Sequence, residues 1–439
     1  MENFKICAFG VVFSLFLSFQ FPDHFGVGAA NVETSPNGLE AWGFIDVRPG
    51  AHMFWWLLKS QNRVNDPNKP WPIILWLHGG PGASGTGIGN FLEIGPFDAN
   101  LKPRNSTWLK KADLLFVDSP VGVGYSYVDD IGLLTKTDSQ AVSDLTTLLR
   151  EVFRSNVTNL ANRTLYIIGE SYGARLAVSL GLSVLNATQA KSLPVQLKGV
   201  TLGSSWISPE DSVLSSGPLL QTFSRIDEIG LEKVNSMANQ IKEKIGESNF
   251  AGAADLYLPL QDVIRNNSNS VDTYNLLRDS MDSTVSTTVL IFLNKTMNGA
   301  IKKKLRLPNN ISWVGASVPV FRNMSTDFMK PRIDEVDKLL SNEGINVTIY
   351  NGQVDLVCGP TGTKAWIQKL KWEGLTTFLN TNRTALYCCG SNKTRGFLKS
   401  YKNFHFYTIL GAGHFVPADQ PDITLQMVGN IINSPGTSK

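Results

Sequence analysis

The chain is poor in cysteine and histidine, with four cysteines and five histidines among 439 residues. If an N-terminal leader carries Cys7 away, Cys358, Cys388 and Cys389 remain, which is enough for one disulfide in an oxidising compartment. We expect Cys358 to pair with either Cys388 or Cys389. No Cys-x-x-Cys motif and no histidine pair at helical spacing is present, so the sequence predicts no catalytic thiol, no metal site and no cofactor.

Long hydrophobic runs are absent beyond the first thirty residues. Residues 1–30 are typical of a signal peptide, because Lys5 precedes an apolar run over 6–21 and small residues at 28–30 offer a cleavage site after Ala30. The run is interrupted by serines and is short for a membrane span, so an uncleaved anchor is the weaker alternative. We expect a mature chain in the secretory pathway, either extracellular or in the lumen of a vacuole or lysosome, without membrane contact.

Charge of either sign is not in excess, since 40 Lys and Arg residues face 37 Asp and Glu residues for a net charge of +3. The densest basic cluster is Lys302-Lys303-Lys304 followed by Arg306, which is more typical of a solvated helix face than of a nucleic-acid site. The apolar fraction of 42% is that of a globular protein, so neither disorder nor a membrane bundle is indicated.

Asn-x-Ser/Thr sequons are abundant, and their eleven occurrences support the secretory interpretation. A sequon inside a β-strand cannot take a glycan, so Asn346, just before an expected strand, is the least suitable. The candidate glycosylation sites are Asn105, Asn156, Asn162, Asn186, Asn266, Asn294, Asn310, Asn323, Asn346, Asn382 and Asn392.

Short apolar runs alternate with amphipathic segments along most of the chain, which is typical of an α/β fold. A β-hairpin is expected over 41–59. Further strands are expected at 73–77, 114–117, 165–168, 198–202, 347–350 and 404–410, and helices at 138–154, 172–185, 333–341, 362–371 and 422–432. We therefore predict a mostly parallel central sheet with helices on both faces. The segment 206–319 reads as helical and polar, so we expect a helical lid insertion between core parts at 31–205 and 320–439.

Gly169-Glu170-Ser171-Tyr172-Gly173 is a G-x-S-x-G pentapeptide between an expected strand and an expected helix. This context is the one that a nucleophile elbow requires, because small residues must flank a serine held in a strained backbone conformation. The helix N-terminus that follows offers free N–H groups and partial positive charge. The sequence thus predicts Ser171 as the nucleophile of a serine hydrolase.

A serine nucleophile needs a base, and four histidines remain beyond the expected leader. His52 lies in the expected hairpin and His405 within a strand, so we expect structural roles for both. His414 follows that strand in a glycine-rich loop at the sheet edge where ligands bind in such folds, and we predict it as the base. Asp355, just beyond the strand at 347–350, is the predicted acidic partner, although an aspartate in an Asn-Gly turn is by itself more typical of a turn former.

The chain order of serine, aspartate and histidine is that of the α/β-hydrolase fold. An oxyanion hole requires two N–H donors. We expect these from Tyr172, the residue after the nucleophile, and from Gly80 in the loop His78-Gly79-Gly80-Pro81-Gly82, for which a purely structural tight turn is the alternative.

Together these motifs resemble the serine carboxypeptidase family, and more narrowly its retinoid-inducible branch and plant serine carboxypeptidase-like relatives. The resemblance covers about 38–428 and is carried by WLHGGPG at 76–82, FVDSPVGVGYSY at 116–127, GESYG at 169–173 and GAGHFVP at 411–417. It implies an α/β-hydrolase fold and the triad Ser171, Asp355 and His414. It also implies that His78, Gly79 and Glu170 bind the terminal carboxylate of a substrate. Because a glutamate donates a hydrogen bond only when protonated, it implies activity favoured at acidic pH.

His78 departs from the family pattern, which has an asparagine or glutamine at this position. We hypothesise that an imidazolium here would make substrate binding tighten as the pH falls. The same loop also resembles that of proline iminopeptidases, which bind a free amino end, but Glu170 and Tyr172 favour the carboxypeptidase interpretation. The insertion looks short around 280–296, which leaves the shape of the lid open.

The predicted function is a serine-type carboxypeptidase that releases C-terminal residues from peptides through an acyl-enzyme. One alternative is a serine carboxypeptidase-like acyltransferase, in which an alcohol takes the acyl group. The other is a catalytically silent binding protein on the same fold. The expected partner is a peptide or a small acyl substrate and no nucleic acid, and the expected state is a monomer or homodimer.

Overall fold

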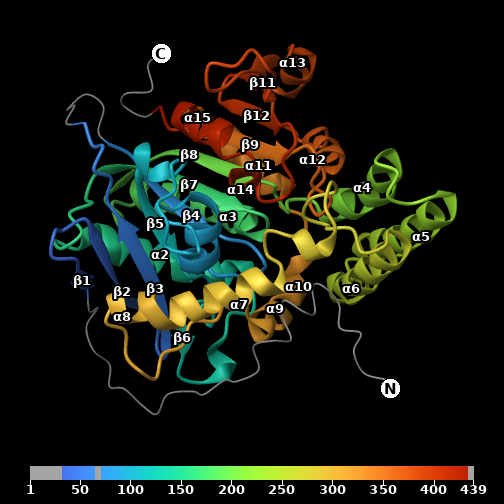
Figure 1. Cartoon of the computed structure of the whole chain (residues 1–439). Helices are drawn as coiled ribbons and strands as arrows, with labels where there is room; N and C mark the ends of the chain where they lie inside the picture. Colours follow the sequence, from blue (N-terminus) through green and yellow to red (C-terminus); the bar gives the residue numbers. More distant parts are fainter. Residues whose placement is uncertain (1–31, 65–70, 434–439) are drawn as a thin grey trace, which may run out of the picture.

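One twelve-stranded sheet runs through the computed structural model, which describes residues 32–64 and 71–433 (Figure 1). The strand order is β1-β2-β3-β5-β4-β7-β8-β9-β12-β11-β10, and β6 pairs with β3. The six strands from β5 to β12 in this order are parallel, and antiparallel strands extend the sheet at both ends. The strands are β1 (Val32–Thr34), β2 (Glu40–Arg48), β3 (Ala51–Leu58), β4 (Ile73–Leu77), β5 (Asp113–Val117), β6 (Tyr127–Val128), β7 (Arg163–Glu170), β8 (Val195–Gly203), β9 (Asn346–Gly352), β10 (Thr384–Leu386), β11 (Gly396–Tyr401) and β12 (Phe404–Ile409).

Helices cover both faces of the sheet, because the central strands are apolar on both sides. Along β4, Ile73 and Leu75 belong to one buried cluster, while Ile74 and Trp76 belong to the other. The first cluster includes side chains of α2 and α3, and the second includes side chains of α15. The predicted mostly parallel sheet with helices on both faces is confirmed. The helices of these layers are α2 (Asp138–Arg154), α3 (Tyr172–Gln189), α11 (Ile333–Leu340), α12 (Pro360–Ile367), α13 (Leu375–Asn380), α14 (Val416–Asp419) and α15 (Pro421–Ile431).

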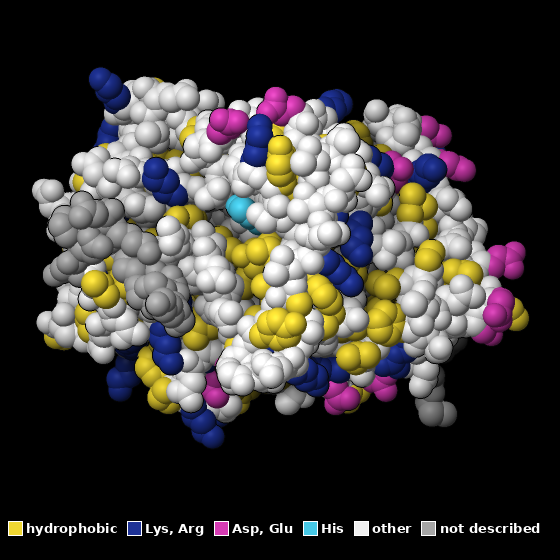
Figure 2. All heavy atoms as spheres, turned by 90° about the horizontal axis from the view of Figure 1, so that it is seen from above, with side chains coloured by type: hydrophobic (Ala, Val, Ile, Leu, Met, Phe, Trp, Pro, Cys, Tyr) yellow, Lys and Arg dark blue, Asp and Glu magenta, His cyan; other side chains and the backbone are white. Residues whose placement is uncertain are grey.

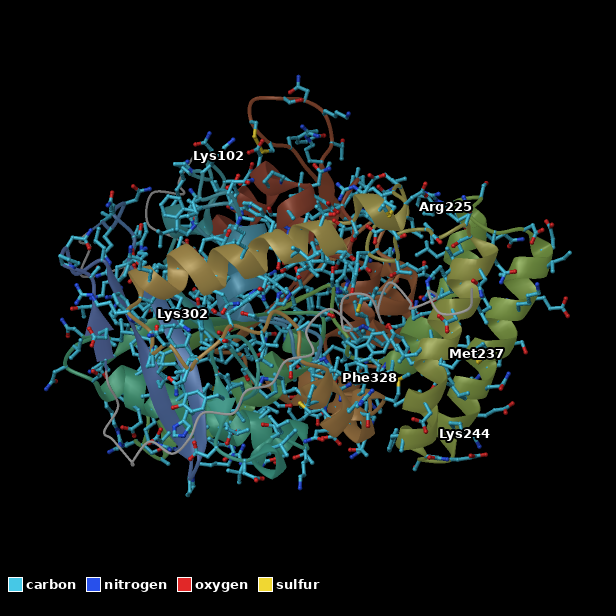
Figure 3. All side chains as sticks on the ribbon, turned by 60° about the horizontal axis from the view of Figure 1, so that its bottom comes forward. Lys102, Arg225, Met237, Lys244, Lys302 and Phe328 are labelled. Carbon is cyan, nitrogen blue, oxygen red and sulfur yellow. A yellow bond between two sulfur atoms is a disulfide. The ribbon has the colours of Figure 1, made fainter. Side chains whose placement is uncertain are left out.

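The segment 206–319 is mostly helical, as its composition predicts, and its helices occupy two places. Helices α5 and α6 project together beyond one end of the molecule, while α7 runs across the sheet (Figure 1). Phe328 lies where the projecting helices meet the body of the molecule, and Lys244 lies at the lower end of these helices in the view of Figure 3. The Phe328 ring centroid is 5.1 Å from that of Tyr257 in α6 and 5.1 Å from that of Trp206. The helices are α4 (Pro209–Thr222), α5 (Glu228–Gly246), α6 (Phe250–Asn267), α7 (Thr287–Thr296) and α8 (Lys302–Lys304).

The surface carries both signs of charge. Figure 2 shows hydrophobic side chains across the middle of one face, with most of the acidic side chains nearer its rim. The three lysines of the basic cluster form the short helix α8, where Lys303 and Lys304 are exposed and Lys304 Nζ lies 2.8 Å from Glu40 Oε1.

Within the described ranges, no helix has both the length and the apolarity of a membrane span. The expected signal peptide, residues 1–30, lies outside the described residues.

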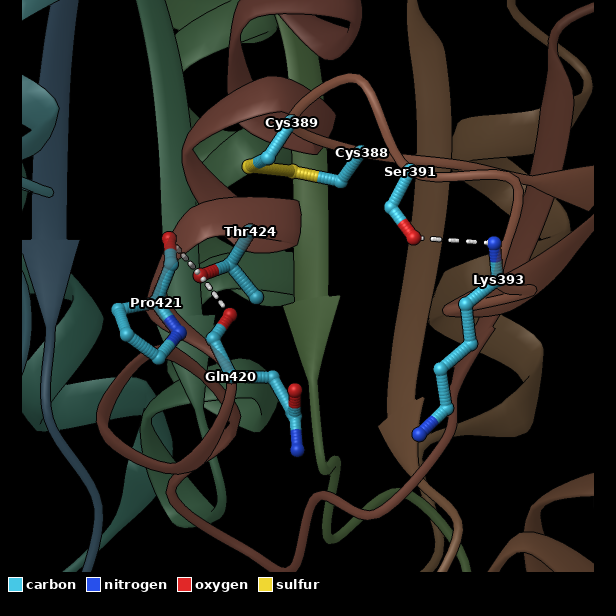
Figure 4. Close-up of a disulfide and its surroundings, with 7 residues drawn as sticks. All are labelled: Cys388, Cys389, Ser391, Lys393, Gln420, Pro421 and Thr424. Atoms are coloured by element: carbon cyan, nitrogen blue, oxygen red, sulfur yellow. Dashed lines mark hydrogen bonds between the residues drawn. A yellow bond between two sulfur atoms is a disulfide. The ribbon is translucent and has the colours of Figure 1, made fainter.

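The expected pairing of Cys358 is wrong. The structure pairs the adjacent residues Cys388 and Cys389, and Figure 4 shows this disulfide with the first turn of α15 in its surroundings. Cys358 is a buried free thiol. The reason is the fold itself, because Cys358 packs in the apolar cluster on one face of the sheet and Cys388 packs in the cluster on the other face.

Candidate functional site

Ser171 stands at a sharp turn between β7 and α3. Its backbone has φ 58° and ψ −124°, a conformation that a residue with a side chain adopts only under strain. The flanking glycines make the turn possible. A Cβ on Gly169 would lie 2.2 Å from the carbonyl oxygen of Gly173, and one on Gly173 would lie 2.1 Å from that of Leu77. The predicted strand–turn–helix context of the pentapeptide is therefore confirmed.

The backbone of this turn is held by the neighbouring strand. Ser171 N–H donates to the Gly203 carbonyl at the end of β8 at 2.9 Å. The Ser171 carbonyl accepts from Trp206 N–H and from Ala174 N–H, each at 3.1 Å. These bonds keep the strained residue in one conformation, so the position of the serine is set by the sheet rather than by a mobile loop.

His414 and Asp355 form a buried pair. Nδ1 of His414 lies 2.9 Å from Oδ2 of Asp355, and the two residues are 2% and 0% exposed. The other carboxylate oxygen, Oδ1, accepts from Cys358 N–H at 3.0 Å. Both carboxylate oxygens are thus engaged, and the imidazole is oriented with Nε2 away from the aspartate.

The two loops that carry this pair pack backbone against backbone. A Cβ on Gly352, at the end of β9, would lie 2.0 Å from the carbonyl oxygen of Gly413, so glycine is required there. His414 N–H donates to the Tyr274 carbonyl at 2.6 Å, and Gly413 N–H donates to Oδ2 of Asp419 at 2.8 Å. Residue 274 lies in the segment between α6 and α7, so the helical insertion helps to place the histidine.

One cavity brings six of the predicted site residues together. Ser171, His414, His78, Gly79 and Gly80 all line it, and so does Glu170. The rest of its wall is mainly apolar and aromatic, with contributions from the helical insertion. Side chains of this kind at the wall include Trp206, Tyr257, Tyr274, Val285, Leu290 and Phe328.

The predicted oxyanion donors follow Ser171 in the chain or lie at the wall of the same cavity. Tyr172 is the first residue of α3, and Gly80 lies at the cavity wall with φ 117°. The Tyr172 side chain turns away from the cavity into a buried polar network, where its hydroxyl donates to Asp138. Asp138 also accepts from Arg175 Nη2 at 2.9 Å and from Arg332 Nη2 at 2.7 Å. This network fixes the first turn of α3, and it was not predicted, because its members lie far apart in the sequence.

A buried pair of acidic residues lies beside the nucleophile, and only one of the two, Glu170, was predicted from the sequence. Glu170 and Glu93 are 0% and 1% exposed. Burial raises the pKa of Glu93 to about 8, and burial together with the Glu93 charge raises the pKa of Glu170 well above its ordinary range. Both carboxyl groups therefore keep their protons at acidic pH. The available signal for Glu93 was its isolation among apolar residues at 91–94, in the helix η1 (Gly85–Ile94).

His78 completes this cluster, but not as an imidazolium. Its Nδ1 lies 3.3 Å from Oε1 of Glu93, and the residue is 7% exposed. Burial, and to a lesser degree the nearby His414, lower the pKa of His78 to about 3. The hypothesis of an imidazolium at acidic pH is therefore contradicted for the free site, because a neutral imidazole costs less to bury.

The remaining histidines lie elsewhere, as expected. His52 on β3 contacts Asp46 and Asp129, and His405 on β12 contacts Ser400 Oγ through Nδ1 at 2.7 Å.

Of the eleven sequons, nine have an exposed asparagine, including Asn346 at the first position of β9. The asparagines of the other two sequons, Asn294 and Asn323, are half-buried.

Among the described residues, one set of three places possible metal ligands close together. His78, Glu93 and Glu170 each offer one donor atom, and these atoms lie within 4.8 Å of one another. Sequence spacing could not reveal this set, because the three residues come from a loop, a helix and a strand end.

A strained serine after a parallel strand, beside a buried histidine–aspartate pair in one cavity, is the arrangement of a serine hydrolase of the α/β-hydrolase fold. A family model for serine carboxypeptidases matches residues 31–434. The chain is 52% identical over 431 residues to serine carboxypeptidase-like 51 of Arabidopsis thaliana, covering 91% of this chain and 93% of that protein. It is 42% identical to the retinoid-inducible serine carboxypeptidase of Homo sapiens, covering 89% and 91% respectively. This chain therefore belongs to the serine carboxypeptidase family.

The solved structure of Kex1Δp, a prohormone-processing carboxypeptidase from Saccharomyces cerevisiae, has a similar fold. The two structures superpose with a TM-score of 0.78 at 23% sequence identity, over 91% of this chain and 92% of the other. The expected α/β-hydrolase fold and the resemblance to serine carboxypeptidases are both confirmed.

Proposed function

We propose that this serine carboxypeptidase removes the C-terminal residue of peptides with Ser171 as nucleophile, His414 as general base and Asp355 as the group that orients His414. The observation that carries the proposal is the 2.9 Å contact between Nδ1 of His414 and Asp355, in a cavity shared with the strained serine. With Nδ1 engaged, Nε2 is the nitrogen left to take the serine proton.

The reaction then follows from these positions. Ser171 Oγ attacks the carbonyl carbon of the last peptide bond while its proton passes to His414 Nε2. His414 returns that proton to the leaving amine, the C–N bond breaks, and an acyl-enzyme on Ser171 remains. Water, deprotonated by His414, hydrolyses this ester. Backbone N–H groups of Gly80 and Tyr172 stabilise the oxyanion in both steps.

The terminal carboxylate of the substrate would bind at Gly79, His78 and Glu170. Glu170 lines the cavity, and burial raises its pKa well above its ordinary range, so at acidic pH it holds its proton and can donate to a carboxylate. Glu93 lies behind it, and its proton can satisfy Nδ1 of His78 at 3.3 Å, which leaves Nε2–H of the neutral imidazole as a further donor. These protonated donors support a preference for substrates with a free C-terminus at acidic pH.

The apolar cavity wall supports a preference for apolar side chains next to the cleaved bond. Trp206, Tyr257 and Phe328 pack against one another on the side where Trp206 binds the Ser171 carbonyl. A large apolar or aromatic side chain on the acyl side of the bond would bury its surface there. We further infer an acidic lumen of the secretory pathway as the setting, and a monomer or homodimer as the working unit.

Product analysis on matched peptides tests this function. The full chain is incubated at pH 5 with N-blocked dipeptides that carry either a free C-terminus or a C-terminal amide, and Ser171→Ala is the control. Release of the terminal amino acid from the free-acid peptide alone is expected. Equal turnover of both peptides would contradict the carboxylate site. If added alcohols or glucose esters gave acyl transfer in place of hydrolysis, the acyltransferase alternative would hold, and no turnover of any substrate would favour a binding protein.

A further inference from the structure

The histidine–aspartate pair joins two loops that leave neighbouring strands of the sheet. Asp355 lies in the loop 353–359 after β9, here called the aspartate loop, and His414 lies in the loop 410–415 after β12, here called the histidine loop. The two strands are paired in parallel. The 2.9 Å contact between His414 Nδ1 and Asp355 therefore depends on how these two loops are held relative to each other.

A third segment, residues 271–279 of the helical insertion, binds the aspartate loop through its backbone. This segment, here called the 271–279 loop, lies between α6 and α7. Leu276 N–H donates to the Val354 carbonyl at 2.9 Å. On the other side of the aspartate, the Thr273 carbonyl accepts from Leu356 N–H at 3.2 Å. The position of the aspartate loop is therefore tied to that of the 271–279 loop.

The 271–279 loop also binds the histidine loop, both directly and through a buried carboxylate. His414 N–H donates to the Tyr274 carbonyl at 2.6 Å, and a Cβ on Gly413 would lie 2.1 Å from the same oxygen. Oδ2 of Asp419 accepts from Gly413 N–H at 2.8 Å and from Asn275 Nδ2 at 2.9 Å. One carboxylate oxygen thus joins the two loops.

Two arginines hold the 271–279 loop and the carboxylate in place. Arg278 Nη2 lies 2.9 Å from Oδ1 of Asp419, whose side chain is 4% exposed. Arg225, between α4 and α5, donates from Nε to the Leu276 carbonyl at 2.7 Å and from Nη2 to the Arg278 carbonyl at 3.1 Å. Hydrogen bonds with a charged partner are shorter and stronger than neutral ones, so they are suited to fixing a loop.

We propose that Asp419 is a positioning residue of the catalytic centre, and that together with the 271–279 loop it sets the geometry of the His414–Asp355 pair. This inference rests on the proposed function for the roles of His414 and Asp355. A misplacement of about 1 Å at a catalytic group can cost about 100-fold in rate, so loss of this support should lower the rate of the chemical step. Asp419 is not among the residues at the cavity wall, so substrate binding should change little.

The charge of Asp419 also contributes to the raised pKa of Glu170, although burial is the largest cause. The assays are therefore run at pH 5, where this carboxyl group keeps its proton because of burial. At this pH an effect on kcat is separated from an effect on carboxylate binding.

The test compares Asp419→Ala, Asp419→Asn and Arg225→Gln with the native chain. Asparagine keeps an oxygen that can accept from Gly413 N–H and alanine does not, so asparagine should restore part of the rate. Arg225 has a side chain that is 26% exposed, so Arg225→Gln keeps the test decisive if the Asp419 variants do not fold. Arg265→Gln is the matched control, because Arg265 pairs at 2.8 Å with Asp262 within α6 of the same insertion.

Two rates are measured on the full chain, the rate of fluorophosphonate labelling at Ser171 and kcat for a blocked dipeptide. Each kcat is expressed per Ser171 that is labelled at completion, so a variant that is only partly folded is not scored as slow. Asp419→Ala is expected to lower both rates about 100-fold, and Asp419→Asn about tenfold, with KM within about twofold of the native value. Arg225→Gln should lower both rates by a smaller factor, and Arg265→Gln should leave them unchanged.

A labelling rate in folded Asp419→Ala that equals the native rate would overturn the proposal. Unchanged rates in Arg225→Gln when the Asp419 variants do not fold would overturn it as well, and so would an equal loss in Arg265→Gln. Because labelling needs no peptide, the proposed carboxypeptidase activity can fail while the labelling rates still decide on the role of Asp419.

Discussion

The buried acid pair Glu93 and Glu170 makes carboxylate binding depend on pH in a defined direction. The perturbation is replacement of both acids by glutamine, Glu93→Gln with Glu170→Gln, in a Ser171→Ala background that prevents turnover. The ligand is an N-blocked dipeptide with a free C-terminus, and the same peptide as its amide is the control ligand. Amide side chains keep N–H donors at every pH, so the double variant removes the titration while it keeps the hydrogen bonds.

The size of the expected change in peptide affinity with pH follows from the pKa of Glu93, which is raised to about 8. A proton that must be present for binding is in place below the pKa and is lost above it, so affinity is highest at acidic pH and falls as the pH rises through 8. Between pH 7 and pH 9 the protonated fraction drops about tenfold, which corresponds to about 1.4 kcal/mol. The ionised pair would then also repel the ligand carboxylate. Glu170→Ala removes the donor altogether and should cost roughly 1.5–3 kcal/mol at pH 5.

Isothermal titration calorimetry between pH 5 and pH 9 checks these values. With acids at both positions, Kd for the free-acid peptide should rise about tenfold between pH 7 and pH 9. The Kd of the double glutamine variant for the same peptide should change by less than about threefold over this range. The amide ligand should bind weakly at every pH. The reasoning is refuted if the double variant shows the same tenfold rise, or if the amide and the acid give the same profile.

Three further predictions concern single residues. Because His78 stays neutral above about pH 3, the KM values of His78→Gln and of the native chain should change in parallel between pH 4 and pH 7. If the two KM curves diverge as the pH falls, His78 is charged at acidic pH and the prediction is wrong. Asp355→Asn should lower kcat by a factor on the order of 10⁴, because the amide favours the wrong imidazole tautomer of His414. The midpoint of urea unfolding should barely change, and a loss of kcat below tenfold would show that Asp355 is not part of the triad. Asp138→Asn leaves Arg175 and Arg332 without their buried partner and should lower the free energy of unfolding by about 3–5 kcal/mol in urea titrations at pH 7; an unchanged midpoint would contradict the network.

The central sheet and the nucleophile could be predicted because their signals are local. The apolar run Ile73–Leu77 agrees with β4 residue for residue, the other predicted parallel strands lie within one to three residues of the observed ends, and the glycines around Ser171 are explained by close backbone contacts within the turn and with β4. Asp355 and His414 were recognisable from their place after β9 and β12, since parallel strands end at the same edge. The short strands β1, β6, β10 and β11 near the ends of the sheet were missed, because segments of two to six residues leave little periodicity in the sequence.

Features that depend on three-dimensional neighbours escaped prediction. The pairing of Cys388 with Cys389 follows from the sheet that separates them from Cys358, which sequence spacing does not report. The neutrality of His78 and the raised pKa of Glu93 result from burial, and burial of a polar residue has no local signature.

Covalent capture of the nucleophile tests the catalytic assignment most directly. The full chain and Ser171→Ala are treated with a fluorophosphonate probe at pH 5, and the adduct is located by mass spectrometry of the digested protein. A single adduct on Ser171, absent from Ser171→Ala and strongly reduced in His414→Ala, is the expected result. An adduct on another serine, or equal labelling of the chain that lacks Ser171, would contradict the assignment.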